Sequence, residues 1–304
     1  MESTLVNLSN ELASIVDVIG PHVVSVKARR HYPSNGILWA KDTVVTVDHA
    51  IQRDEDIAVV LADGKSTPAT LVGRDPSTDL AVLKLQTAAA PQVQLTKAAS
   101  VKPGELALVI GRSPDSGANA SLGIISATSG AWRTWRGGQL DAYIRLDAKL
   151  FPQSSGGAVI SVRGELIGIA TSALSRIAGV AIPISTVANV AEKVLERGFV
   201  PRGYFGIGVQ PVPFSDALRK KLSMANRSGL IVLTVEPGGP ADKAGLLIGD
   251  VVTSIAETAI EDADDLQRFS DSGVVGTAVN INYVRGGALK QSPLTVEERP
   301  AKRS

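Results

Sequence analysis

Short runs of Val, Ile and Leu, separated by Gly, Pro, Asp and Ser, fill the chain from about residue 23 to residue 183. Apolar or alternating runs of about 4 to 8 residues between turn formers predict β-strands. Because no helical spacing intervenes, we expect an all-β domain here, an antiparallel barrel or sandwich rather than βαβ units. The clearest predicted strands cover residues 23–26, 44–47, 57–61, 80–85, 106–110, 144–146, 158–162 and 165–170, the last two joined by a hairpin turn at Arg163-Gly164.

The spacing of the apolar positions changes after residue 184. Val187, Val190 and Val194 recur at helical intervals, which predicts a helix. Ser185 is expected to cap its start, and Gly198 is expected to end it. Residues 199–203 then predict a short linker that closes a first domain over residues 8–198.

Mixed elements follow in residues 204–297 and predict a second domain of the α+β type. Strands are expected at residues 205–209, 230–235, 251–255 and 279–284, and helices near 215–222, 240–244 and 262–269. The charged residues 298–304 are expected to form a frayed tail.

Composition narrows the functional classes. Among 304 residues, 31 Lys and Arg balance 30 Asp and Glu, so the basic excess of a nucleic-acid binder is missing. The absence of Cys excludes disulfides, thiolate metal sites and a thiol nucleophile. No apolar run approaches the ~18 residues of a membrane span, and the first four residues lack the basic start of a secretion signal. His22 and His31 have no partners at metal-ligand spacing, so no metal or other cofactor is expected.

Three segments each place a reactive side chain at a strand edge or tight turn. Residues 43–50 form a strand that ends at His49, residues 75–83 deliver Asp79 just before an apolar strand, and residues 152–158 hold Ser155 in a Gly-rich loop. Each signal alone is weak, because a lone His is usually a surface or core residue, Asp-Pro-Ser-Thr-Asp usually makes a turn, and Ser-Gly-Gly is usually a loop.

Together, the three side chains form a complete chemical set. A serine hydroxyl needs a base to take its proton, and an imidazole suits that role at neutral pH. The imidazole needs a carboxylate on its other nitrogen, and the oxyanion needs backbone N–H donors. The chain order His, Asp, Ser is that of the chymotrypsin arrangement.

The sequence resembles the HtrA (DegP-like) family of trypsin-fold serine proteases with a C-terminal PDZ domain. The resemblance covers residues 8–297 and is carried by residues 46–50 (TVDHA), 75–85, 147–157, 181–183 (AIP), 202–207 (RGYFGI), 239–246 (GPADKAGL) and 249–252 (GDVV). It implies a chymotrypsin-like double antiparallel β-barrel followed by a small PDZ domain.

The resemblance also implies roles for the catalytic residues. His49 is expected to be the general base, Asp79 its orienting carboxylate and Ser155 the nucleophile, with the backbone N–H groups of Gln153 and Ser155 as oxyanion donors. The family usually has Asn-Pro-Gly-Asn-Ser-Gly-Gly in this loop, whereas residues 151–157 read FPQSSGG. A residue with a Cβ at position 153 pays about 1 to 3 kcal/mol for backbone conformations open to glycine. A working protease with weakened chemistry is therefore expected, and an inactive scaffold that binds chain ends is the alternative.

The resemblance also implies that Lys149, Leu150 and Val180 line the substrate pocket. If the Lys149 ammonium points into the pocket, acidic substrate residues are favoured. If it points outward, the family preference for small aliphatic residues holds, and this second interpretation is the expected one because an unpaired buried ammonium is costly.

By the same resemblance, the backbone of Tyr204, Phe205, Gly206 and Ile207 would hold a peptide's terminal carboxylate, and the peptide would add as a strand beside residues 206–210. Residues 238–241 (GGPA) lack a Walker lysine, so a nucleotide site is rejected. Residues 132–138 (WRTWRGG) could stack on single-stranded nucleic acid. By the resemblance they are instead expected to form a loop near the substrate cleft, at its rim or in a subunit contact, and an inert exposed loop is the alternative. Unfolded polypeptide substrates, a homotrimer and a periplasmic or cell-envelope location are expected, with no nucleic-acid partner.

Overall fold

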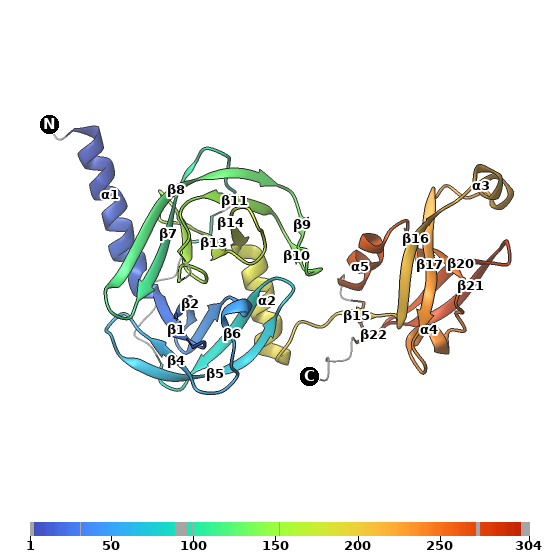
Figure 1. Ribbon diagram of the computed structural model, residues 1–304, viewed down its shortest axis with the longest axis horizontal. Helices are drawn as coiled ribbons and strands as arrows, with labels where there is room; N and C mark the ends of the chain where they lie inside the picture. Colours follow the sequence, from blue (N-terminus) through green and yellow to red (C-terminus); the bar gives the residue numbers. More distant parts are fainter. Residues whose placement is uncertain are drawn as a thin grey trace. The chain divides into compact units, whose positions relative to one another are not determined.

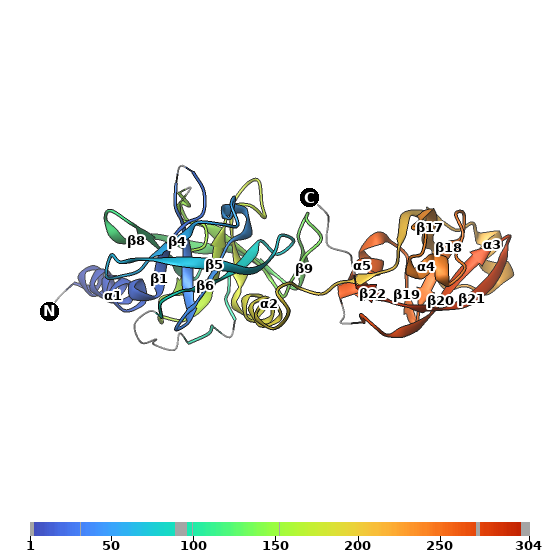
Figure 2. The ribbon, with the colours of Figure 1, turned by 90° about the horizontal axis from the view of Figure 1, so that it is seen from below.

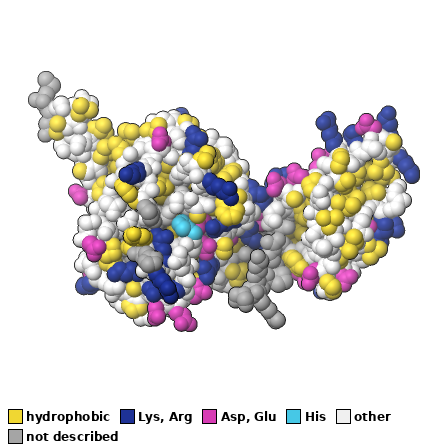
Figure 3. All heavy atoms as spheres, viewed as in Figure 1, with side chains coloured by type: hydrophobic (Ala, Val, Ile, Leu, Met, Phe, Trp, Pro, Cys, Tyr) yellow, Lys and Arg dark blue, Asp and Glu magenta, His cyan; other side chains and the backbone are white. Residues whose placement is uncertain are grey.

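The computed structural model of the protein describes residues 3–30, 32–88, 96–98, 100–151, 153–271 and 274–298. The chain divides into two compact units, Met1–Val200 and Pro201–Ser304. The division lies inside the expected linker of residues 199–203. Basic and acidic side chains are interspersed on the face that Figure 3 shows.

The first unit consists mainly of two closed antiparallel barrels (Figure 1). The first barrel has the order β1-β2-β3-β6-β5-β4 and contains β1 (Val23–Lys27), β2 (Ser34–Ala40), β3 (Thr43–Thr46), β4 (Ile57–Val60), β5 (Ser66–Asp75) and β6 (Leu80–Leu85). The second has the order β11-β14-β13-β12-β7-β8 and contains β7 (Leu106–Ser113), β8 (Gly117–Ser129), β11 (Tyr143–Asp147), β12 (Ala158–Ser161), β13 (Leu166–Thr171) and β14 (Gly179–Pro183). The predicted double antiparallel barrel is confirmed, and the sandwich alternative is excluded.

One apolar core joins the two barrels. Val23 and Val82 of the first barrel, Ile110 and Ile169 of the second, and Val190 of the closing helix belong to the same buried cluster. A close-packed core resists deformation, so it fixes the loops at the junction of the barrels relative to one another.

The closing helix α2 (Ile184–Arg197) packs against β5, β6 and β13 (Figure 2). It ends at Gly198, which takes the left-handed conformation (φ +80°) as expected for a C-cap. The expected Ser185 cap is wrong: Pro183 precedes the helix, and no side chain caps it. Because Pro183 still pairs with Gly168 in the barrel, strand β14 runs directly into the helix and leaves no loop for a capping residue.

A helix that the pattern did not predict, α1 (Thr4–Ile19), precedes the first barrel (Figure 1). The Ser3 hydroxyl accepts a hydrogen bond from the Val6 N–H and caps its start. Leu12, Ile15 and Val16 pack against the barrel core, whereas Leu5 and Val18 are exposed.

His22, in the short 3₁₀ turn Gly20–His22 that leads into β1, is only 5% exposed. Burial lowers its pKa below the ordinary 6.5 because it disfavours the charged ring. The unfolded chain therefore binds the proton more readily, so this residue removes stability progressively as pH falls below about 6.5, and removes none well above it.

We expect His22→Gln to flatten the loss of stability between about pH 7.5 and pH 5.5. Urea unfolding followed by Trp fluorescence measures this in the first unit alone, because the three Trp, at positions 39, 132 and 135, all belong to it. Parallel pH curves for the two proteins would contradict the expectation.

The second unit is a small α+β domain. Its sheet has the order β16-β17-β18-β20-β21, with β19 paired to β18, and β15 pairs separately with β22. The elements are β15 (Gly203–Tyr204), β16 (Ile207–Pro213), α3 (Asp216–Leu222), β17 (Ser228–Val235), α4 (Pro240–Lys243), β18 (Val251–Ile255), β19 (Thr258–Ala259), α5 (Ala263–Asp271), β20 (Ala278–Arg285), β21 (Ala288–Thr295) and β22 (Glu297–Glu298). The strand expected from Phe205 begins only at Ile207, because Gly206 has φ +71° and interrupts the extended backbone.

Candidate active site

His49 and Asp79 emerge side by side from paired strands. His49 lies in a 3₁₀ turn, Asp48–Ala50, directly after β3, and Asp79 lies directly before β6. β3 and β6 are neighbours, with Thr46 opposite Ala81, so the two side chains leave the barrel at the same end. The Asp48 N–H donates to the Asp79 carbonyl at 3.1 Å and holds the two turns together.

The Asp79 carboxylate is buried and accepts hydrogen bonds from three groups. His49 Nδ1 lies 2.9 Å from Oδ2 and 3.0 Å from Oδ1, and the His49 backbone N–H donates to Oδ1 at 2.9 Å. The Thr171 hydroxyl donates to Oδ2 at 2.5 Å. Donation from Nδ1–H to the carboxylate leaves the lone pair on Nε2, the nitrogen that a general base uses.

The turn before Asp79 explains how its carboxylate is oriented. The Asp75 carboxylate accepts from the Ser77 hydroxyl at 2.6 Å and the Thr78 hydroxyl at 2.8 Å. Asp79 itself has φ +60°, a left-handed conformation that Asp tolerates better than most residues. The turn chemistry of this segment therefore serves to present the second aspartate.

The Ser155 loop is held between the two barrels. The Asn35 N–H of β2 donates to the Ser155 carbonyl at 2.9 Å, and the Gly156 N–H donates to the Ala170 carbonyl of β13 at 2.8 Å. Gly156 has φ +87°, and a Cβ there would lie 1.9 Å from the Asn35 carbonyl oxygen. Only glycine fits at this crossing point.

The nucleophile candidate lies next to the histidine–aspartate pair without being bonded to it. The Ser155 hydroxyl is 3.2 Å from the Ser172 hydroxyl, and Ser172 directly follows Thr171, the donor to Asp79. Among the described residues, the structure has no hydrogen bond between Ser155 and the His49 ring. Catalytic hydrogen bonds are often long or poorly aligned in a protein without substrate, so this geometry is compatible with Ser155 as the nucleophile.

Thr171 and Ser172 were missed by sequence reasoning. They are the first polar residues after the apolar run of β13, a weak signal that only the pairing of distant strands makes meaningful.

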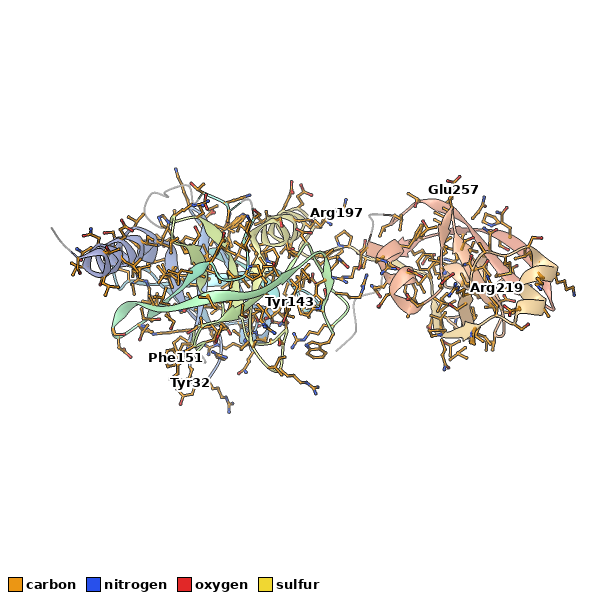
Figure 4. The ribbon with its side chains drawn as sticks, turned by 90° about the horizontal axis from the view of Figure 1, so that it is seen from above. Tyr32, Tyr143, Phe151, Arg197, Arg219 and Glu257 are labelled. Carbon is orange, nitrogen blue, oxygen red and sulfur yellow. The ribbon has the colours of Figure 1, made fainter. Side chains whose placement is uncertain are left out.

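The predicted pocket residues are placed as follows. Leu150 lies against β14, where a Cβ on Gly179 would come within 2.4 Å of its Cδ1, and Val180 is buried on the same strand. Lys149 is exposed, and its ammonium lies 4.8 Å from the centre of the Phe151 ring. Phe151 is itself 46% exposed and projects from the first unit on the same side as Tyr32 (Figure 4). The Lys149 charge is therefore stabilised by an aromatic face and solvent.

A second carboxylate, unforeseen from the sequence, lies beside the histidine. Asp48 is buried, and burial raises its pKa, while Arg74 at 3.6 Å and Arg136 at 3.9 Å oppose that shift. Arg136 also lies 3.9 Å from the Asp79 carboxylate. Two arginines thus balance two buried carboxylates next to the imidazole.

The second unit offers an unpaired strand edge. Over the part of the sheet that the structure describes, β16 pairs only with β17, and α5 packs beside it. Gly206 has φ +71°, while the Phe205 and Gly206 carbonyls accept hydrogen bonds from Ala241 and Glu236 at 3.0 and 2.8 Å. Tyr204 pairs with Glu297 and Ile207 pairs with Val235, so Phe205 and Gly206 are the two residues of the predicted carboxylate-binding segment that lie between the strands.

Across residues 3–298, apart from the positions that the structure leaves undescribed, no cluster of three or more His, Cys, Asp or Glu side chains could hold a metal ion. Within the same residues, no helix is both long and apolar enough to cross a membrane.

Two family models match the chain: a trypsin-like peptidase domain over residues 34–169 and a PDZ domain over residues 205–296. A probable periplasmic serine endoprotease, DegP-like, of Brucella suis is 32% identical over 267 residues, covering 84% of this chain and 50% of that protein. The serine endoprotease DegS of Haemophilus influenzae is 31% identical over 276 residues, covering 88% of this chain and 77% of that protein. The chain thus spans about half the length of the DegP-like relatives it matches.

Solved structures agree with these matches. An HtrA-type protease, AlgW, with a decapeptide superposes with a TM-score of 0.78 at 27% identity, covering 95% of this chain and 99% of that one. The serine endoprotease from Yersinia pestis superposes with a TM-score of 0.76 at 28% identity, covering 95% of this chain and 98% of that one.

Proposed function

Since the chain belongs to the HtrA family of serine proteases with a PDZ domain, we propose that it is a serine endopeptidase that cleaves unfolded polypeptides through an acyl-enzyme on Ser155. The observation that carries this proposal is the Thr171–Asp79–His49 hydrogen-bond chain around the buried Asp79 carboxylate, together with the contact between the Ser155 hydroxyl and Ser172, the residue after Thr171.

In the first half of the reaction, Ser155 Oγ attacks the scissile carbonyl carbon while His49 Nε2 takes its proton. Asp79 stabilises the imidazolium that forms, and the N–H groups of Ser155 and Gln153 donate to the oxyanion. The imidazolium then gives its proton to the leaving amine, and the acyl group stays on Oγ. A water molecule, deprotonated by the same imidazole, releases the acid and restores the serine.

The exposed position of Lys149 supports a preference for small aliphatic residues before the scissile bond, because its ammonium lies over the Phe151 ring and in solvent. Cleavage-site mapping on an unfolded protein tests this preference. Cuts mainly after Asp or Glu would reverse it.

Two features support the second candidate, a weak or inactive scaffold that binds chain ends: the Ser155 hydroxyl contacts Ser172 instead of the His49 ring, and Gln153 occupies the oxyanion loop. A fluorophosphonate probe separates the two, because only an activated serine is labelled, and peptide mapping should place the label on Ser155. A time course on unfolded casein, with Ser155→Ala as the blank, measures turnover. A wild type that is labelled and degrades casein supports the protease. Equal and negligible rates of casein degradation by the wild type and Ser155→Ala support the inactive scaffold instead.

We further propose that the second unit binds peptide C-termini along β16, that the chain forms a homotrimer through its N-terminal segment, and that it acts in the periplasm or cell envelope. The exposed apolar residues Leu5, Val6 and Val18 on α1 support a subunit contact there.

The names of the Brucella relatives support a periplasmic location. Light scattering tests the assembly, and peptides with free or amidated C-termini test the carboxylate contact.

A further inference from the structure

A short loop between two strands of the first unit touches both sides of the candidate active site. The loop joins β9 (Trp132–Arg133) to β10 (Gln139–Leu140). The Thr134 hydroxyl donates to the Ser77 carbonyl at 2.7 Å, in the turn that presents Asp79. The neighbouring Trp135 reaches the opposite side, where its indole N–H donates to the Ala173 carbonyl at 3.2 Å.

Trp135 is 70% exposed and yet held in place. Besides the indole hydrogen bond, the Arg136 guanidinium lies 4.9 Å from the centre of its ring. Arg136 is in turn fixed by donation to the Pro76 carbonyl at 3.2 Å and by the nearby Asp48 and Asp79 carboxylates. An aromatic surface that is already ordered binds a partner at a low cost in conformational entropy.

The indole stands close to the bond-breaking position. Ala173, its hydrogen-bond partner, directly follows Ser172, whose hydroxyl is 3.2 Å from that of Ser155. An extended substrate advances about 3.3 Å per residue. A side chain two or three residues from the scissile bond therefore lies within reach of the indole.

The arginines of this loop are engaged by the protein itself. Arg133 donates to the Gly137 carbonyl at 2.8 Å, and Arg136 faces two carboxylates. This arrangement leaves the aromatic face as the surface offered to a partner, and it disfavours the phosphate contacts that a nucleic acid needs.

We propose that Trp135 forms an apolar subsite that selects polypeptides with a large aliphatic or aromatic side chain two or three residues from the bond that is cut. The proposal rests on the proposed function and names a specificity determinant for it. Polypeptides that expose such side chains are unfolded ones, because folded proteins bury them.

The test uses two sets of peptides that are identical except for Leu or Gly at the positions two and three residues before the scissile bond. All are amidated at the C-terminus, so that recognition of a free carboxylate contributes nothing. We expect Trp135→Ala to lower kcat/KM for the Leu peptides about tenfold, mainly through KM, and to leave the Gly peptides within about twofold. Trp135→Phe, which keeps an aromatic face without the indole N–H, should retain most of the Leu preference.

Val162→Ala is the matched control, because Val162 is 43% exposed in the hairpin at the end of β12 away from Ser155. The rate of labelling by a small fluorophosphonate is measured for every protein, and the peptide rates are divided by it, so that a change in the reactivity of Ser155 is not counted as a change in the subsite. An unchanged Leu-over-Gly ratio in Trp135→Ala overturns the proposal while leaving the protease intact.

A second measurement keeps the two proposals separable. Binding of the same peptides, carrying a fluorophore, to Ser155→Ala by anisotropy requires no turnover. Weaker binding of Leu peptides when Trp135→Ala is added supports the subsite even if the wild type fails to be labelled. Equal binding with and without the indole overturns it.

Discussion

Replacing Asp79 with Asn is expected to lower kcat/KM about 10⁴-fold, as an asparagine at this place in a serine–histidine–aspartate triad does by imposing the wrong tautomer. The amide oxygen of the substituted side chain would still accept from the His49 backbone N–H, and its NH₂ group would then face His49 Nδ1 and Thr171. Because an NH₂ group only donates, Nδ1 must accept, and the ring proton moves to Nε2. The histidine then has no lone pair for the Ser155 proton.

The control is Thr171→Val, which removes one donor to the carboxylate but leaves the tautomer of His49 unchanged. We expect a much smaller loss from it than from Asp79→Asn. The urea midpoint of the first unit is measured for both variants. Where the midpoint differs from that of the wild type, the measured rate is corrected for the fraction of unfolded protein. A loss of less than about tenfold in a folded Asp79→Asn protein contradicts the assigned role of Asp79.

Replacing Gln153 with Gly is expected to raise kcat by up to about a hundredfold, the rate that one oxyanion donor typically supplies. The Ser154 N–H donates to the Phe151 carbonyl at 2.8 Å, and Gln153, the third of residues 151–154, does not have a positive φ. A type II turn needs a positive φ at its third residue, which favours Gly, whereas a type I turn accepts a side chain there. The two types differ by a flip of the central peptide, and therefore in where the Gln153 N–H points.

Gln153→Ala is the matched control, because alanine has the same aversion to positive φ and should bring no gain. Single-turnover rates on an amide substrate separate acylation from product release. If Gln153→Gly and Gln153→Ala have equal acylation rates, the orientation of the Gln153 N–H does not limit the reaction.

The strand pattern of the first unit could be predicted where apolar residues dominate, as in β3, β6 and β13. It failed for α1, whose outer face is exposed, and for the 13-residue β8, whose Ala, Asn and Ser residues lie mostly at the surface. The cap of α2 failed for another reason: Pro183 remains in the barrel ladder until the helix begins. For β8, which pairs with β7 and β11, and for the start of α2, tertiary neighbours rather than local propensity decided the structure.

By itself, the sequence determined which residue types could form a nucleophile, a base and its carboxylate, and it placed each at a strand edge, because local periodicity and turn chemistry act over a few residues. Only the tertiary structure decided that Thr171 donates a hydrogen bond to Asp79 and that the Ser155 hydroxyl contacts Ser172 rather than His49. It also decided that Trp135 contacts Ala173 and that Arg136 lies near the Asp79 carboxylate. These contacts join residues from 17 to 92 positions apart. They depend on barrel register and side-chain rotamers, which no short stretch of the chain encodes.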